Sequence, residues 1–400
     1  MSKAEPMASQ ASDHAALRFV ILLGVLSLFA DMTYEGARSV AGSYLAVLGA
    51  TGAIVGLIAG VGEFAGYGIR LFSGILSDRP GRSWWIMAMG YGVNLLAVPM
   101  LALAGRWEIA AALLVLERIG KGIRTPVRDA MLSHAAEITG RGKAFGLHEA
   151  LDQIGAILGP ILIALVLWHQ HAYPLAFGAL ALPALMALSV LGAARVAYPD
   201  PGRFGATAEP EASPALPRGF WLYLAGVALL AAGFVDFAFI AFHLERTGLV
   251  ARPWIPIAYA IAMGTDALAA LALGWAWDRV GPRLLGGGVL FTALAAPMIF
   301  LGGPVGLMIG LIMWGTGMGL QESIMRALLA AQVPSHRRGT AYGIFHTIYG
   351  FAWMMGSLLL GKLYDHSVPI MAWSAFAMQI GALLVLLYWA ERERITLSAS

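Results

Sequence analysis

Three ionisable side chains interrupt an apolar segment near the start of the chain. Residues 29–40 read FADMTYEGARSV, and at 100° per residue Asp31, Glu35 and Arg38 fall within roughly 60° of one another on a helix. Carboxylates exchange protons, and arginine forms charge-assisted hydrogen bonds with carboxylates. The stripe therefore has the chemistry of a proton-binding site in a polar pathway.

A charge at the centre of a membrane helix costs about 2.5 to 3.5 kcal/mol on insertion scales, so such residues face protein or water. Competition between the desolvation of a carboxylate and its pairing with a nearby arginine can produce a proton switch. We expect Asp31 and Glu35 to bind the proton, with Arg38 and Arg118 tuning them and Asp152 in reserve. The alternative is a permanently paired network that only holds the helices in register.

Further polar residues are candidates for the lining of a substrate cavity. They are Tyr34, Glu63, Lys121, Glu149, Asp236, Glu322 and Arg326. Lys121 shares a predicted helix face with Arg124 and Arg128, and this basic stripe has two interpretations. It binds an anionic substrate, or Arg124 and Arg128 only lie near the cytoplasmic end of their helix. Ionisable residues are sparser in the second half of the chain, which predicts that ion coupling resides in the first half.

The composition indicates that these residues lie among membrane-spanning helices. Of the 400 residues 59% are hydrophobic and 12% are charged, against about 25% charged in soluble proteins. Twelve apolar segments are each long enough to cross a hydrocarbon core about 30 Å thick. They lie at residues 18–47, 52–73, 84–104, 108–132, 144–168, 174–196, 219–242, 254–276, 284–302, 305–331, 340–361 and 370–390. The alternating pattern of an outer-membrane barrel is absent, so we expect an all-α membrane protein.

Basic residues in the short loops predict the orientation, because they resist translocation. With the N-terminus inside, most loop arginines and lysines fall on the cytoplasmic side, so both termini are expected to be cytoplasmic. Residues 1–17 form a polar tail without the features of a cleavable signal peptide, and residues 392–400 form a second tail. The net charge of +3 follows from this excess of basic residues in the cytoplasmic loops, so we expect no nucleic-acid partner. The absence of cysteine excludes a disulfide and a thiolate metal site.

A stretch rich in proline, glycine and alanine divides the apolar segments into two sets of six. Residues 198–217 read YPDPGRFGATAEPEASPALP and are expected to be a cytoplasmic linker between bundles at residues 18–197 and 218–391. Both bundles carry matching motifs. GILSDRPGR at 74–82 corresponds to GWAWDRVGPR at 274–283, and RGKAFG at 141–146 corresponds to RGTAYG at 338–343. This repetition predicts two pseudo-symmetric six-helix bundles.

The repeated loop resembles a signature of the major facilitator superfamily, glycine-x-x-x-aspartate-arginine-x-glycine-arginine, which follows the second helix. The matching residues are Gly74, Asp78, Arg79, Gly81 and Arg82. Ser83 stands where a second basic residue is common. The resemblance implies a latch that breaks and re-forms as a transporter changes state, with Asp278 and Arg279 in the second copy. Alternatively, the basic loop only sets the topology.

Two further segments resemble motifs of the same family. Arg118 and Lys121 lie in RIGKG, which is similar to an arginine-x-x-glutamine-glycine segment of the fourth helix. Gly155, Gly159 and Pro160 resemble the start of a glycine-x-x-x-glycine-proline motif that occurs in exporting, antiporter branches. The later glycine pair of that motif is replaced by isoleucine and alanine.

The resemblance implies a secondary transporter that rocks two bundles around a central site. Proton-coupled export of a small molecule is favoured by the acidic first span and the antiporter-like segment. Proton-coupled import of an organic acid or other metabolite is the alternative, supported by the basic side chains of 108–132. Buried charges argue against a receptor or scaffold, and no catalytic or nucleotide-binding motif predicts an enzyme. We expect a monomer in the inner (plasma) membrane, with a small-molecule substrate, protons and lipid as partners and with no cofactor or metal.

Overall fold

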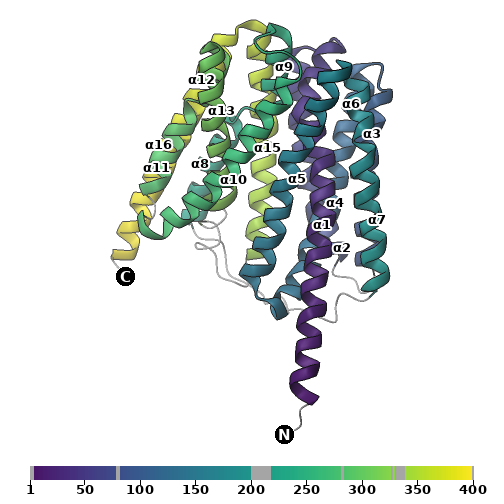
Figure 1. The fold of residues 1–400 in the computed structure, drawn as a ribbon. Coiled ribbons are helices and arrows are strands. Elements are labelled where there is room, and N and C mark those ends of the chain that lie inside the picture. The colour runs from purple at the N-terminus through teal and green to yellow at the C-terminus, as the bar shows by residue number, and fades with distance from the viewer. Residues whose placement is uncertain are drawn as a thin grey trace. The chain divides into compact units, whose positions relative to one another are not determined.

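The computed structural model describes residues 4–77, 82–199, 218–280, 283–325, 328 and 338–398, and these residues form helices and short connections without a strand (Figure 1). The helices of the first half are α1 (Ala4–Val47), α2 (Gly52–Ser77), α3 (Ser83–Met100), η1 (Leu101–Leu103), α4 (Trp107–Thr139), α5 (Arg141–Gln170), α6 (Tyr173–Ala179) and α7 (Ala181–Ala197). Those of the second half are α8 (Arg218–Gly233), α9 (Phe237–Thr247), α10 (Trp254–Val280), α11 (Arg283–Ala293), α12 (Ala295–Leu301), α13 (Gly303–Leu320), η3 (Gln321–Met325), α15 (Arg338–His366) and α16 (Val368–Ser398).

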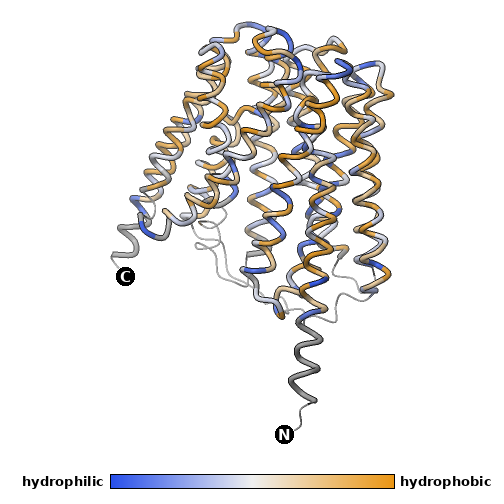
Figure 2. Tube along the Cα trace, viewed as in Figure 1, coloured by the Kyte–Doolittle hydropathy of each residue, from blue (hydrophilic) through white to orange (hydrophobic). Residues whose placement is uncertain are grey.

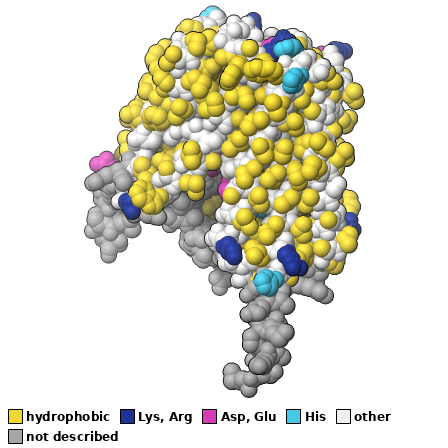
Figure 3. Space-filling model, viewed as in Figure 1, with side chains coloured by type: hydrophobic (Ala, Val, Ile, Leu, Met, Phe, Trp, Pro, Cys, Tyr) yellow, Lys and Arg dark blue, Asp and Glu magenta, His cyan; other side chains and the backbone are white. Residues whose placement is uncertain are grey.

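Ten helical stretches of the described chain are long and apolar enough to cross a membrane. Figure 2 shows long hydrophobic runs along these helices, and Figure 3 shows that hydrophobic side chains cover most of one face. The predicted all-α, multi-pass membrane architecture is therefore confirmed. The predicted span 108–132 lies in α4, which carries more charged residues than the ten candidate spans do. The predicted span 284–302 corresponds to the shorter apolar helices α11 and α12. The count of twelve stays a prediction.

One predicted span is broken in the structure. Residues 219–242 were expected as a single helix, but α8 ends at Gly233 and α9 begins at Phe237. Asp236 occupies the N-cap of α9 with an extended backbone, and its side chain accepts a hydrogen bond from the backbone nitrogen of Ala238 at 2.8 Å. An aspartate at this position supplies an acceptor to the unsatisfied first turn of a helix, which stabilises a new helix start.

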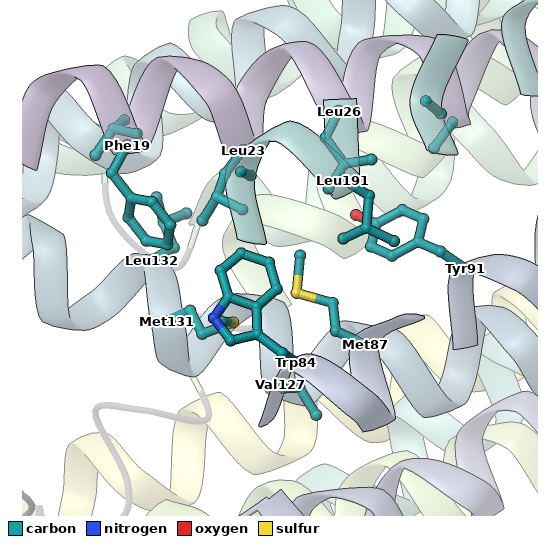
Figure 4. Packing of buried hydrophobic residues seen from close by; sticks show 14 of the residues in the cluster. Phe19, Leu23, Leu26, Trp84, Met87, Tyr91, Val127, Met131, Leu132 and Leu191 are labelled. Atoms are coloured by element: carbon teal, nitrogen blue, oxygen red, sulfur yellow. The ribbon is translucent and has the colours of Figure 1, made fainter. Parts of the chain in front are cut away.

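The chain forms two compact units, and the first contains residues 1–37, 69–104 and 112–209. Its apolar core is built from α1, α3, α4 and α7, and includes Phe19, Leu23, Trp84, Met87, Val127, Met131 and Leu191 (Figure 4). Two hydrogen bonds link Tyr198, which directly follows α7, to α3 and α1. Trp84 Nε1 donates to the carbonyl of Tyr198 at 3.0 Å, and the Tyr198 hydroxyl donates to the carbonyl of Ala15 at 3.1 Å. This core holds α1 and α4 side by side, and both carry charged residues.

The second unit contains residues 38–68, 105–111 and 210–400. It includes 38–68, a segment that the sequence predicts as part of the N-terminal bundle. In this segment a Cβ atom at Gly42 would collide with Ala238 of α9, and one at Gly56 would collide with the backbone of Ser357 in α15. Only glycine permits such close approach of backbones. The C-terminal part of α1 and most of α2 therefore pack directly on α9 and α15.

Candidate functional site

The acidic stripe of α1 faces a basic stripe of α4 inside the first unit. Asp31 is 5% exposed and Arg124 is 0% exposed, and their atoms Oδ1 and Nη2 are 4.0 Å apart. Neither of these two atoms makes a hydrogen bond with any residue that the structure describes. A separation of 4.0 Å allows electrostatic attraction but exceeds hydrogen-bond length. The two buried charges are thus paired without direct contact.

Two tyrosines hold Arg124 in place. Its Nη1 donates to the Tyr91 hydroxyl at 3.1 Å, and its guanidinium carbon lies 4.4 Å from the centroid of the Tyr91 ring and 5.4 Å from that of Tyr34. A guanidinium over an aromatic face gains cation–π attraction, and the gain is larger when both groups are desolvated. A Cβ atom at Gly90 would lie 2.7 Å from the backbone nitrogen of Arg124, so α3 approaches α4 closely here. This packing fixes where the arginine points.

A second acid–base pair lies one turn further along the same face. Glu35 Oε1 is 3.5 Å from Lys121 Nζ, and that ammonium lies 3.8 Å from the centroid of the Tyr34 ring. The Lys121 side chain is 22% exposed, whereas Arg124 is fully buried. Of these two bases, Lys121 is the one that a dissolved molecule can reach.

Glycines in α5 bring its backbone against α1 at the level of Asp31. A Cβ atom at Gly155 would collide with the carbonyl oxygen of Leu28 and lie 2.9 Å from the Cβ of Asp31. A Cβ at Gly159 would collide with the carbonyl oxygen of Met32. Pro160 follows directly within α5. The three motif residues thus lie where α5 contacts the acidic stripe.

One turn before Gly155, Asp152 belongs to a group of four polar side chains from three helices. Asp152 Oδ2 is 3.4 Å from His148 Nδ1 and 3.5 Å from Arg128 Nη1. Ser27 Oγ on α1 is 3.1 Å from His148 Nε2 and accepts from Arg128 Nη1 at 3.1 Å. Arg128 is therefore held by contacts with both α1 and α5. We name these four residues, Ser27, Arg128, His148 and Asp152, the polar ring.

The two arginines that the sequence assigns to the tuning of Asp31 and Glu35 form ion pairs with other carboxylates. Arg118 Nε is 3.5 Å from Glu117 Oε2, on the neighbouring residue of α4. Arg38 lies in the second unit, where Nη2 is 3.5 Å from Glu63 Oε1 and 3.2 Å from Asp236 Oδ2. Arg38, Glu63 and Asp236 thus form a separate charged group, which joins α1 and α2 to the start of α9.

The remaining predicted residues are distributed as follows. Glu149 is exposed and accepts a hydrogen bond from Gln153 at 3.4 Å, and Glu322 is half-buried in η3. Of the latch residues, Gly74 is half-buried and Arg82 is exposed, while the Arg279 guanidinium lies 3.5 Å from the centroid of the Trp275 ring. The predicted residues outside the described part of the chain are Asp78, Arg79, Gly81, Arg326 and the side chain of Asp278.

Sequence reasoning did not select several polar residues that the structure places at this site. Asn94 is fully buried, and its Nδ2 donates to the Oε1 of Glu117 at 2.8 Å and to its carbonyl at 3.1 Å. Ser27 and His148 complete the polar ring. The available signals were an asparagine within an apolar span and a histidine four residues before Asp152, a spacing that places both on one helix face.

Comparison with known proteins agrees with this architecture. Residues 21–357 match the family model of the Major Facilitator Superfamily. An uncharacterised protein of Mycobacterium bovis is 41% identical over 380 residues, which cover 93% of each chain. An uncharacterised MFS-type transporter of Methanocaldococcus jannaschii is 24% identical over 384 residues, which cover 94% of this chain and 96% of that protein.

Solved transporters share the fold at low sequence identity. The crystal structure of the nucleoside transporter NupG matches 93% of this chain and 98% of its own, with a TM-score of 0.71 and 14% identity. The peptide transporter POT in complex with sulfate matches 94% of both chains, with a TM-score of 0.76 and 15% identity. With the family model covering most of the sequence, the chain belongs to the major facilitator superfamily.

Proposed function

We propose that this protein is a secondary transporter of the inner (plasma) membrane that exports a small molecule in exchange for protons, with Asp31 as the principal proton-binding residue. The observation that carries the proposal is the buried pair of Asp31 and Arg124, whose facing atoms are 4.0 Å apart and lack hydrogen bonds within the described chain. Desolvation favours the neutral form of a carboxyl group, and a nearby guanidinium favours the charged form. A small rearrangement of α1 against α4 can change which effect dominates.

The exchange follows from competition between the proton and the substrate. A protonated Asp31 loses its attraction for Arg124, while a charged Asp31 restores it. A substrate that binds beside Lys121 and Glu35 lies one helical turn from this pair and changes the local charge. Export is favoured over import by the contact of Gly155 and Gly159 with α1, because this part of α5 resembles the antiporter motif.

Proton flux in everted membrane vesicles tests the proposal. Respiration acidifies the vesicle interior, and an exported substrate added outside collapses that gradient when it exchanges for protons. Panels of lipophilic cations, organic anions and metal ions are compared in vesicles with the wild-type protein and with Asp31→Asn. We expect one class to collapse the gradient in the wild type only. The exposed acid Glu137 on α4 offers the matched control, and Glu137→Gln should behave as wild type.

Import of an organic acid with protons is the second candidate function. The partly exposed Lys121 supports it, because an ammonium near a tyrosine ring can bind a carboxylate by a charge-assisted hydrogen bond. Right-side-out vesicles with an imposed inward proton gradient would then accumulate labelled organic acids. Accumulation there, with no gradient collapse in everted vesicles, would replace export by import.

A further inference from the structure

The polar ring allows the direction of each hydrogen bond to be deduced. Arginine only donates and a carboxylate only accepts, whereas a serine hydroxyl has a single hydrogen to give. Arg128 donates to Ser27 Oγ, so the Ser27 hydrogen is available for His148 Nε2. A neutral His148 then carries its hydrogen on Nδ1, which faces Asp152 Oδ2 at 3.4 Å. The hydrogen bonds among the four side chains thus run in one consistent direction, while Asp152 Oδ1 has no hydrogen-bond partner among the described residues.

A second proton on His148 requires only a local change. Protonation of Nε2 turns that nitrogen into a donor, so Ser27 must accept from both His148 and Arg128. The Ser27 hydrogen can rotate to the backbone carbonyl four residues earlier, which is a common acceptor for serine within a helix. His148 is 4% exposed, so bulk water cannot easily replace these contacts. The ring thus accommodates both protonation states of the histidine without moving a helix.

Charged groups from three helices surround this histidine. On α5 the neighbour is Asp152, whose Oδ1 makes no hydrogen bond with the described residues. From α4, Arg128 Nη1 lies 3.5 Å from Asp152 Oδ2, and Arg128 Nη2 lies 2.9 Å from Asp129 Oδ1. From α1, Asp31 packs against Gly155, which follows Asp152 by three residues on α5, because a Cβ atom at Gly155 would lie 2.9 Å from the Cβ of Asp31. A proton on His148 therefore changes the charge close to the contact between α5 and α1 that positions Asp31.

We propose that His148 is a second proton-binding residue of the transport cycle, which takes up a proton at Nε2 and holds it between Ser27 and Asp152. The added proton places a positive charge beside the carboxylate of Asp152, on the helix that contacts α1 at the level of Asp31. This inference rests on the proposed proton coupling at Asp31 and adds a residue that stores the proton.

The test is nitrogen NMR of the purified full-length protein in lipid nanodiscs, with histidine labelled by 15N, between about pH 5 and pH 8, where histidine side chains change charge. The signal of His148 is identified by its loss in His148→Gln and, should that variant fail to fold, by its shift in Ser27→Ala. His169 lies on the same helix and is exposed, so His169→Gln identifies an ordinary solvated histidine as the control.

We expect the His148 signal to show the Nδ1–H tautomer at the alkaline end and the doubly protonated ring at the acidic end. We also expect Asp31→Asn to displace the midpoint of this change, while the His169 signal is unaffected. A His148 signal that does not change between these pH values overturns the proposal, as does a midpoint identical in wild type and Asp31→Asn. Failure of the proposed function would appear separately, as an absence of proton flux in the vesicle assays.

Discussion

Replacing Gly155 by alanine perturbs the contact that positions Asp31 against α5. The new Cβ would collide with the carbonyl oxygen of Leu28 and lie 2.9 Å from the Cβ of Asp31. Neither a helix carbonyl nor a Cβ atom can rotate away, so α5 must move away from α1. We expect this movement both to destabilise the first unit and to alter the 4.0 Å separation of Asp31 from Arg124.

The magnitude follows from two opposing effects. An added methyl group in a closely packed interior costs about 1 to 3 kcal/mol, and a collision with backbone places this site near the upper value. Alanine is favoured over glycine within a helix by about 1 kcal/mol. The expected net loss is therefore about 2 kcal/mol in the free energy of unfolding.

Gly146 provides the control, because it lies exposed on the same helix and its Cβ would meet no described atom within 4 Å. In Gly146→Ala only the gain in helix propensity applies, so its free energy of unfolding should rise by up to about 1 kcal/mol. Thermal unfolding of the purified variants in detergent, followed by tryptophan fluorescence, should rank Gly146→Ala above wild type and wild type above Gly155→Ala. A Tm of Gly155→Ala at or above that of wild type would refute the reasoning.

Three further substitutions test other contacts. Asp365→Ala removes the carboxylate that accepts from two backbone N–H groups at the start of α2, at 2.7 and 2.8 Å. Loss of such a cap costs about 1 kcal/mol, so Tm should fall, and an unchanged Tm would contradict a capping role. Asn94→Ala withdraws both hydrogen bonds from Glu117, and a loss of about 1.5 to 3 kcal/mol is expected, since bonds to charged groups are the stronger ones. Denaturant titration measures it, and a loss below about 0.5 kcal/mol, the low end for any hydrogen bond, would argue against a charged Glu117. Lys121→Ala should weaken binding of a carboxylate substrate by about tenfold or more, because one charge-assisted bond contributes roughly 1.5 to 3 kcal/mol. Unchanged affinity in a direct binding assay would remove the anionic interpretation.

Helical periodicity predicted that Asp31 and Glu35 share a face of one helix, and both are buried on α1. Their partners could not be predicted in the same way. Arg38 lies on the same predicted stripe, but in the structure it pairs with Glu63 and Asp236. Spacing within a helix gives an angle around its axis, whereas pairing across helices depends on how far each helix is shifted along its neighbour.

The break between α8 and α9 shows a second limit of sequence reasoning. Residues 219–242 are apolar enough to read as one span, and hydropathy averages over the interruption. Gly233 and Asp236 carried the local signal, because glycine is common after a helix end and aspartate is a favoured N-cap. The extended backbone at Asp236 and its contact with Arg38 were visible only in the structure.

The sequence by itself determined that the chain is helical and embedded in a membrane, and that polar stripes run along its helices. Composition and periodicity are local properties, so they do not depend on which helices pack against one another. Only the tertiary structure decided that Arg124 faces Asp31 and that Ser27 and Arg128 join His148 and Asp152. These contacts depend on separations of 3 to 4 Å between side chains of different helices. Such separations are set by backbone contacts at positions such as Gly155, where a single added carbon would shift one helix against another.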